Sequence, residues 1–203
     1  MQLPVLLRYG ILIGTCAFVV FFLWKKYIYN PFDKTFLRAQ AGDADAQYEL
    51  GIIYYQGKYI PQNFEEAFRW FSASAEQGNL RALMALAALY NAGQGCEKDP
   101  KKMFHYYELG AAQNDFEARI NLAVCYLQGT GTEKDEVKGF TLLKQAADDK
   151  SPLAQTLTAG LYERGTGTEK DTDKALYYYL LAAKQGEPRA KEKLKKLRGG
   201  PRP

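Results

Sequence analysis

The chain has 203 residues, of which 47% are hydrophobic and 25% are charged, a composition typical of a globular protein and not of a disordered one. Its formal net charge is +4, but residues 41–186 hold 15 Lys and Arg against 20 Asp and Glu, so the positive charge lies at the two ends. An acidic central region argues against a nucleic-acid-binding core, which would present a basic face.

The first element is an apolar stretch from Leu3 to Trp24 in which only Arg8 is charged. Twenty-two helical residues span about 33 Å, enough for the hydrocarbon core of a bilayer. We therefore predict an N-terminal transmembrane helix, with residues 1–26 as the anchor. A cleaved signal sequence is the alternative, although the stretch ends in Trp-Lys-Lys without a cleavage pattern of small residues.

The charges around this stretch favour one orientation. Lys25, Lys26, Lys34 and Arg38 follow it, while Arg8 precedes it, so the positive-inside rule favours a single-pass cell-membrane protein with a cytoplasmic body over a periplasmic one. The cysteines of the body do not decide the compartment, because the sequence leaves open whether Cys96 and Cys125 pair.

After a stretch interpreted as a linker, residues 27–41, the chain repeats itself at a spacing of 36 residues over 42–187. The recurring positions fall at helical spacings on one stripe of a first helix, which glycine ends. These columns are Ala46, Ala82, Ala118, Ala154 and Ala190; Leu50, Leu86 and Leu122; Gly51, Ala87, Ala123 and Ala159; Tyr54, Tyr90, Tyr126 and Tyr162; and Gly57, Gly93, Gly129 and Gly165.

A second helix is predicted in each repeat from another set of recurring positions. Its columns are Ala67, Met103, Gly139 and Ala175; Phe68, Phe104, Phe140 and Leu176; Trp70, Tyr106, Leu142 and Tyr178; Phe71, Tyr107, Leu143 and Tyr179; and Ala75, Ala111, Ala147 and Ala183.

The loop between the two helices also repeats. "GTGTEKD" fills Gly129–Asp135 and Gly165–Asp171, and "GQGCEKD" fills Gly93–Asp99. A phosphate-binding loop would need Gly-Lys followed by Ser or Thr, or a third glycine after a strand. We predict instead that the first glycine stops one helix, the next continues the turn, and Asp135 or Asp171 caps the next helix.

These residues resemble the Sel-one-like (Sel1-like) repeat family of tetratricopeptide-like helical repeats. The resemblance rests on "AQYELGIIYYQG", "ARINLAVCYLQGTGTEKD" and "DKALYYYLLAAKQG". It implies an all-α fold, an α/α solenoid of four 36-residue helix-turn-helix repeats. Departures are the first loop, "GKYIPQN", which lacks the second glycine, and Met103 and Gly139, which replace an alanine. Residues 188–203 are predicted to form a basic capping helix and tail, whose lysines are also suited to anionic lipid headgroups.

The resemblance implies a scaffold that binds a protein or peptide on the concave side of the solenoid. First-helix columns that change from repeat to repeat are then candidates for partner contact, or else free surface. They are Tyr48, Met84, Ile120 and Thr156; Ile52, Ala88, Val124 and Gly160; and Tyr55, Asn91, Leu127 and Glu163. From them we select Tyr48, Ile52, Tyr55, Met84, Asn91, Ile120, Val124, Leu127 and Glu163 as partner-binding residues.

Catalysis finds little support in the sequence. His105 is the only histidine, and no Cys and His cluster has metal-ligand spacing. We therefore expect no catalytic, metal or cofactor site, no nucleic-acid partner and no small-molecule substrate. The predicted function is that of a membrane-anchored, non-enzymatic adaptor. The alternative is an exported soluble repeat protein with an unrecognised hydrolytic or immunity-type activity.

Overall fold

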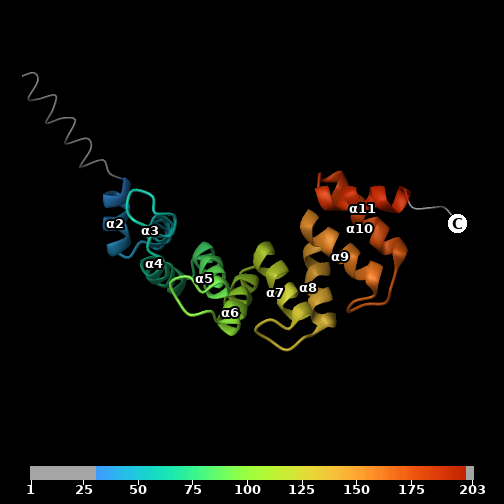
Figure 1. The fold of residues 1–203 in the computed structure, drawn as a ribbon, viewed down its shortest axis with the longest axis horizontal. Coiled ribbons are helices and arrows are strands. Elements are labelled where there is room, and N and C mark those ends of the chain that lie inside the picture. The colour runs from blue at the N-terminus through green and yellow to red at the C-terminus, as the bar shows by residue number, and fades with distance from the viewer. Residues whose placement is uncertain (1–30, 200–203) are drawn as a thin grey trace, which may run out of the picture. The chain divides into compact units, whose positions relative to one another are not determined.

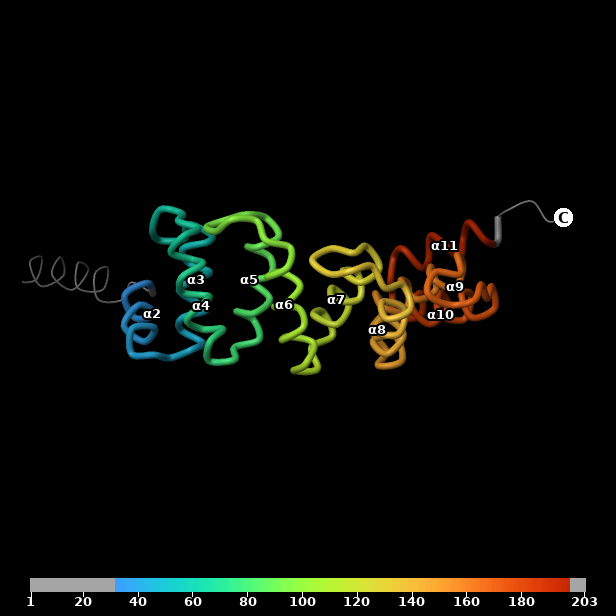
Figure 2. Tube along the Cα trace, turned by 90° about the horizontal axis from the view of Figure 1, so that it is seen from below, coloured from blue at the N-terminus to red at the C-terminus, as the bar shows by residue number. Residues whose placement is uncertain are grey.

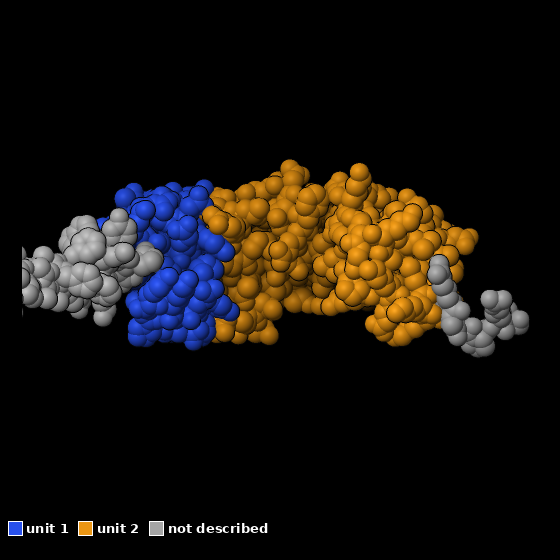
Figure 3. Space-filling model, turned by 90° about the horizontal axis from the view of Figure 1, so that it is seen from above, with its two compact units in different colours: residues 1–77 blue, residues 78–203 orange. Residues whose placement is uncertain are grey.

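The computed structural model describes residues 31–199, which form helices and connecting loops without a β-strand. The chain divides into two compact units, one ending at Gln77 and one beginning at Gly78 (Figure 3). Figure 1 labels the helices along the chain. The first unit holds α2 (Pro31–Gln40), α3 (Ala44–Gln56) and α4 (Phe64–Glu76). The second unit holds α5 (Leu80–Ala92), α6 (Pro100–Ala112), α7 (Phe116–Gln128), α8 (Glu136–Asp148), α9 (Pro152–Arg164), α10 (Thr172–Lys184) and α11 (Pro188–Gly199).

Each predicted repeat forms a pair of helices that pack against each other. α3 pairs with α4 in the first unit, and α5 with α6, α7 with α8 and α9 with α10 in the second. In the second unit α6 also contacts α7, and α8 contacts α9, so successive pairs stack side by side (Figure 2). Stacking covers the apolar face that a single pair leaves open. The predicted solenoid of helix-turn-helix repeats is therefore confirmed.

The repeated loop ends one helix and begins the next as the sequence predicts. The glycine after each first helix adopts the left-handed conformation, with φ between 68° and 72°, and the N–H of Gly165 donates to the carbonyl oxygen of Leu161 at 2.8 Å. Asp135 and Asp171 each accept a hydrogen bond from the backbone N–H three residues ahead, at 2.9 Å. Both caps satisfy backbone groups that helix ends leave unpaired.

The second glycine of the loop continues the turn, as predicted, and also makes a close contact that the sequence does not indicate. Gly131 and Gly167 have φ of 74° and 67°, and each lies against the first turn of the second helix of the preceding pair. A Cβ atom on Gly167 would overlap the carbonyl oxygen of Glu136 and lie 2.9 Å from Cβ of Phe140. The loop is therefore a joint between consecutive repeats as well as between two helices.

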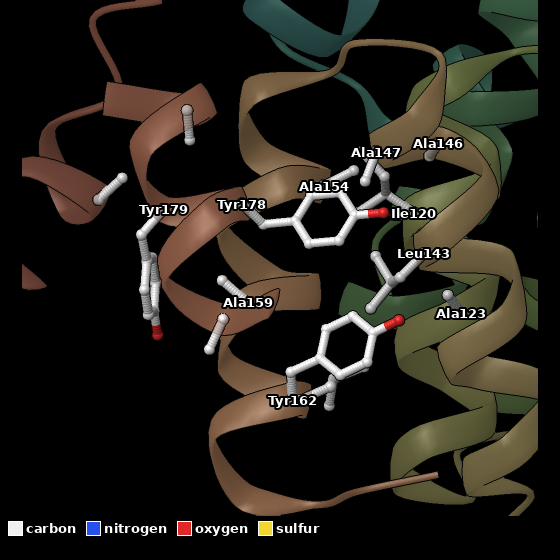
Figure 4. Close-up of a cluster of buried hydrophobic side chains, with 14 of the residues drawn as sticks. Ile120, Ala123, Leu143, Ala146, Ala147, Ala154, Ala159, Tyr162, Tyr178 and Tyr179 are labelled. Atoms are coloured by element: carbon white, nitrogen blue, oxygen red, sulfur yellow. The ribbon is translucent and has the colours of Figure 1, made fainter. Parts of the chain in front are cut away.

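The recurring aromatic residues join one helical pair to the next. In the second unit a buried apolar cluster extends from α7 to α11, and Figure 4 shows much of it. The ring of Phe104 meets the ring of Tyr126 edge to face with centroids 5.3 Å apart, and Phe140 meets Tyr162 in the same way at 5.1 Å. Each contact links a second helix to the first helix of the following pair.

A polar pair joins the two helices of three repeats at one recurring position. Two of the pairs join two amides and one joins a guanidinium to a carboxylate, although the place is the same. The three pairs are Gln77 Nε2 donating to Gln47 Oε1 at 2.7 Å, Arg119 Nη1 donating to Asp149 Oδ2 at 2.7 Å, and Gln185 Nε2 donating to Gln155 Oε1 at 2.9 Å. We call these the interhelix polar pairs.

Residues 31–40 form a helix although the sequence predicts a linker over 27–41. Ala39 of α2 is 1% exposed and lies 36 residues before Ala75, in the alanine column of the second helices. The ring of Phe32 meets that of Tyr54 edge to face with centroids 6.1 Å apart, which repeats the Phe and Tyr contacts of the second unit. α2 therefore packs on α3 as the second helix of a preceding repeat would.

The C-terminal helix α11 packs on α10 and continues the first-helix columns. Ala190 and Leu194 are buried, in line with Ala46 and Leu50 of the first repeat. Lys193 Nζ forms an ion pair with Glu163 Oε2 of α9 at 3.0 Å. Leu197 is 49% exposed, so α11 covers the last complete repeat and leaves an apolar side chain in solvent.

The predicted transmembrane helix over residues 1–26 lies outside the described residues. Between residues 31 and 199, none of the helices combines the length and the apolar character that crossing a bilayer requires.

Candidate binding groove

A groove with an apolar floor lies between the first helices of the third and fourth repeats, within the second unit. Its volume is about 310 Å³. It is lined by residues of α7, α8 and α9 and of the loop after α9. These are Val124, Leu127, Gln128, Leu143, Leu157, Leu161, Arg164 and Thr166. We call it the α7–α9 groove.

Helical spacing explains why apolar side chains meet in this groove. Val124 and Leu127 are three residues apart on α7, and Leu157 and Leu161 are four apart on α9, so each pair shares one face of its helix. Leu143 is 1% exposed and belongs also to the buried cluster, where Figure 4 labels it. The floor of the groove is therefore continuous with the core, while Val124, Leu127 and Leu157 are half-buried at its walls.

Gly139 of α8 makes room for one wall of the groove. A Cβ atom on Gly139 would lie 2.7 Å from Cγ of Leu127 and 2.9 Å from the carbonyl oxygen of Ala123. The other repeats have a larger residue in this column. The departure from alanine at Gly139 is thus explained by the leucine that fills the space above it.

Of the nine residues selected from the sequence, the groove brings together Val124 and Leu127. Ile120 is 7% exposed and belongs to the buried cluster. Met84 lies beside α6, where its sulfur would be 3.4 Å from a Cβ atom on Gly110. Asn91 is exposed on α5. Variation from repeat to repeat therefore marks core positions as well as surface ones.

Three selected residues lie on α3 in the first unit. The ring of Tyr48 is 5.6 Å from that of Phe71, and the ring of Tyr55 is 5.4 Å from that of Phe64. Ile52, which lies between the two tyrosines in the sequence, is half-buried. The two tyrosines pack against their own second helix, and Tyr55 keeps 36% of its surface exposed.

Glu163, the ninth selected residue, belongs to a network that joins three helices. Its carboxylate accepts hydrogen bonds from Tyr179 Oη of α10 at 2.8 Å and from Lys193 Nζ of α11 at 3.0 Å. The bond from Lys193, helped by that from Tyr179, lowers the pKa of Glu163 despite partial burial. Burial and the negative Glu163 raise the pKa of Tyr179. Glu163 therefore links α9 to α10 and to α11.

The sequence argument missed several residues of the groove. Leu157 and Arg164 stand in columns that also change between repeats: Glu49, Ala85, Asn121 and Leu157, and Gln56, Ala92, Gln128 and Arg164. Both columns vary between repeats as the column of Val124 does, so variation alone could have identified them. Leu143 and Leu161 sit in apolar columns that periodicity assigns to the core, and the structure places them at the floor.

Two larger grooves lie between second helices. One of about 460 Å³ lies between α6 and α8, and one of about 470 Å³ between α8 and α10. They correspond at the 36-residue spacing, so that Leu142 in one matches Tyr178 in the other. Tyr178 Oη donates to Asp148 Oδ1 at 2.8 Å, and burial followed by this bond raises the pKa of Tyr178. Several of their polar groups pair with each other, as Arg119 with Asp149 and Gln185 with Gln155 also do.

His105, Cys96 and Cys125 do not line the α7–α9 groove. His105 is exposed on α6 beside Tyr106, with ring centroids 5.8 Å apart. Cys96 and Cys125 are free thiols, and burial raises the pKa of both. Over residues 31–199 no three His, Cys, Asp or Glu side chains are placed to hold a metal ion. The groove itself offers apolar surface edged by Gln128, Arg164 and Thr166.

Comparison with known proteins gives consistent matches. The Sel1 repeat matches four consecutive stretches, 44–79, 80–115, 116–151 and 152–187. The sel1-like repeat-containing protein L18 of Acanthamoeba polyphaga mimivirus is 44% identical over 43 residues, which are 21% of this chain and 7% of that protein.

Two solved structures resemble the fold closely. The crystal structure of c5321, a protective antigen present in uropathogenic Escherichia coli strains, matches with a TM-score of 0.77 and 29% identity over 80% of this chain and 35% of that one. A Sel1 repeat protein from Oxalobacter formigenes matches with a TM-score of 0.72 and 32% identity over 76% of this chain and 63% of that one. The chain thus spans less than two thirds of the length of each of these relatives.

Proposed function

This chain belongs to the Sel1 repeat family, and on that premise we propose that it is a scaffold that holds a protein or peptide partner in the α7–α9 groove. Sel1 repeat proteins are generally protein-interaction scaffolds. The observation that carries the proposal is the half-buried apolar wall formed by Val124, Leu127 and Leu157 over a buried floor. A few anchor residues seated in well-packed, desolvated pockets carry most of the binding energy of protein interfaces.

A charge placed in this groove is expected to abolish binding without unfolding the chain. Leu157→Glu should reduce the amount of co-purified partner at least tenfold, because a carboxylate buried under an apolar anchor loses its hydration. Leu153→Glu is the matched control, since Leu153 lies one turn away on α9, is 39% exposed and does not line the groove. Quantitative co-purification measures the effect, and far-UV circular dichroism checks the helix content.

Equal loss of partner in both variants would count against the groove. So would a loss confined to Tyr177→Glu, since Tyr177 lines the groove between α8 and α10.

We further propose that residues 1–26 anchor the scaffold in the cell membrane, with the repeats on the cytoplasmic side. The supporting observations are the 22-residue apolar stretch from Leu3 to Trp24 and the cationic residues Lys25 and Lys26 that follow it.

Fractionation tests this second part. The full-length chain is expected to stay with membranes through an alkaline wash, because a spanning helix is not released by disrupting charge contacts. The repeats should also resist a protease added to intact spheroplasts. A soluble chain shortened by about 25 residues would instead indicate a cleaved export signal, and digestion in intact spheroplasts would reverse the orientation.

A further inference from the structure

We propose that the segment held in the α7–α9 groove is a peptide that carries an acidic side chain next to its apolar anchor, and that the acidic group pairs with Arg164. This inference rests on the proposed function of the groove and adds the chemistry of the partner.

Arg164 is the only charged residue that lines the groove. It ends α9 and is exposed. Gly160, one turn earlier, leaves space for it, because a Cβ atom there would lie 3.3 Å from Nη1 and 3.9 Å from Nη2 of Arg164. The first three repeats have Ile52, Ala88 and Val124 at that place. In the fourth repeat the two positions are Gly160 and Arg164. In the earlier repeats the first position has a larger residue and the second has a neutral one.

The charge of Arg164 is only partly balanced within the chain. Glu163 is next to it in sequence, but the carboxylate of Glu163 is engaged by Lys193 at 3.0 Å and by Tyr179 at 2.8 Å. Among residues 31–199 no carboxylate oxygen forms an ion pair with Arg164. Arg164 attracts Glu163 and helps to lower the pKa of that carboxyl. Arg164 and Lys193 nevertheless bring two positive charges to the single negative charge of Glu163, so one positive charge at this edge of the groove is unbalanced.

The lining of the groove selects between classes of partner. A volume of about 310 Å³ accommodates one or two large apolar side chains. A purely apolar segment would cover the guanidinium without offering an acceptor, and the desolvation of an unpaired charge opposes binding. A carboxylate removes that penalty and forms a charge-assisted, bidentate hydrogen bond with arginine. An acidic residue beside a Leu, Ile or Phe anchor satisfies both parts of the site.

The test uses a phage-displayed library of random 12-residue peptides, selected against the full chain held in detergent. Selected peptides are expected to carry Asp or Glu next to a large apolar residue. One such peptide is then synthesised with its acidic residue and with the matching amide, and its affinity is measured by fluorescence anisotropy. Arg164→Gln should weaken binding of the acidic peptide about tenfold or more and should leave the amide peptide unaffected.

Charge reversal and a matched control complete the design. Arg164→Glu should restore binding to a peptide whose acidic residue is replaced by lysine, which a loss of folding could not produce. Arg189→Gln removes an exposed arginine on α11 outside the groove and should not change the affinity.

Two different failures remain distinguishable. Peptides that lose binding in Leu157→Glu but show neither an acidic residue nor sensitivity to Arg164→Gln would overturn the acidic partner while the groove stands. Selected peptides that bind equally well to Leu157→Glu would overturn the proposed function of the groove itself.

Discussion

Replacing Gly167 with alanine is expected to lower the free energy of unfolding by about 2 to 5 kcal/mol. Two costs add: a residue with a Cβ resists positive φ, at about 1 to 2 kcal/mol, and an atom forced into a packed site costs about 1 to 3 kcal/mol. Here the atom would overlap the carbonyl oxygen of Glu136, and a backbone atom of α8 cannot rotate away as a side chain can.

Gly186→Ala separates these two costs. Gly186 has φ of 97° but no atom within 4 Å of an added Cβ, so only the first cost of about 1 to 2 kcal/mol applies. Chemical denaturation followed by circular dichroism measures both variants. If Gly167→Ala were no more destabilising than Gly186→Ala, the loop would not be a joint between consecutive repeats.

Truncating Tyr179 to alanine is expected to cost about 4 kcal/mol of stability, as for other large buried aromatic residues. Tyr179 is 2% exposed and donates its hydroxyl hydrogen to Glu163. Tyr179→Phe keeps the ring and leaves the carboxylate with Lys193 alone, so it should cost about 1 to 2 kcal/mol.

Tyr177→Ala is the internal control, because Tyr177 lies two residues away on the same helix and is 57% exposed. Its effect should stay within about 0.5 kcal/mol. Thermal and chemical unfolding of the three variants test the series. Similar losses at Tyr177 and Tyr179 would contradict the burial that assigns Tyr179 to the core.

The architecture was predictable because most buried positions recur every 36 residues. Alanine, leucine and tyrosine columns locate the first helices, and Gly165 and Asp171 mark where a helix ends and the next begins. α2 escaped notice although Phe32 and Ala39 stand 36 residues before Phe68 and Ala75. Half a repeat gives too few matches to stand out beside four whole ones.

The groove was only partly predictable, for a physical reason. Columns that vary were taken as surface, but a buried position also varies when a neighbour compensates, as Leu127 and Gly139 do. Ile120 varies within its column and is nevertheless buried. A single sequence lacks the pairing information that distinguishes compensation from exposure, and it does not reveal that Leu157 and Arg164 converge on the same groove as Val124.

The interhelix polar pairs are relevant to misfolding in repeat proteins. Similar repeats could pair in the wrong order, with a helix of one repeat packed against a helix of another. A shifted assembly that set α7 against α10 would place Arg119 opposite Gln185 and would deprive the Asp149 carboxylate of its guanidinium. It would also separate Gln155, which is 2% exposed, from the Gln185 amide that donates a hydrogen bond to it. A buried amide that loses a hydrogen-bond partner is costly, whereas the Asp149 side chain is 49% exposed and would lose only its ion pair. The ion pair of the third repeat thus favours the native pairing of α7 with α8, whereas the amide pairs of the first and fourth repeats are alike and do not distinguish those two repeats.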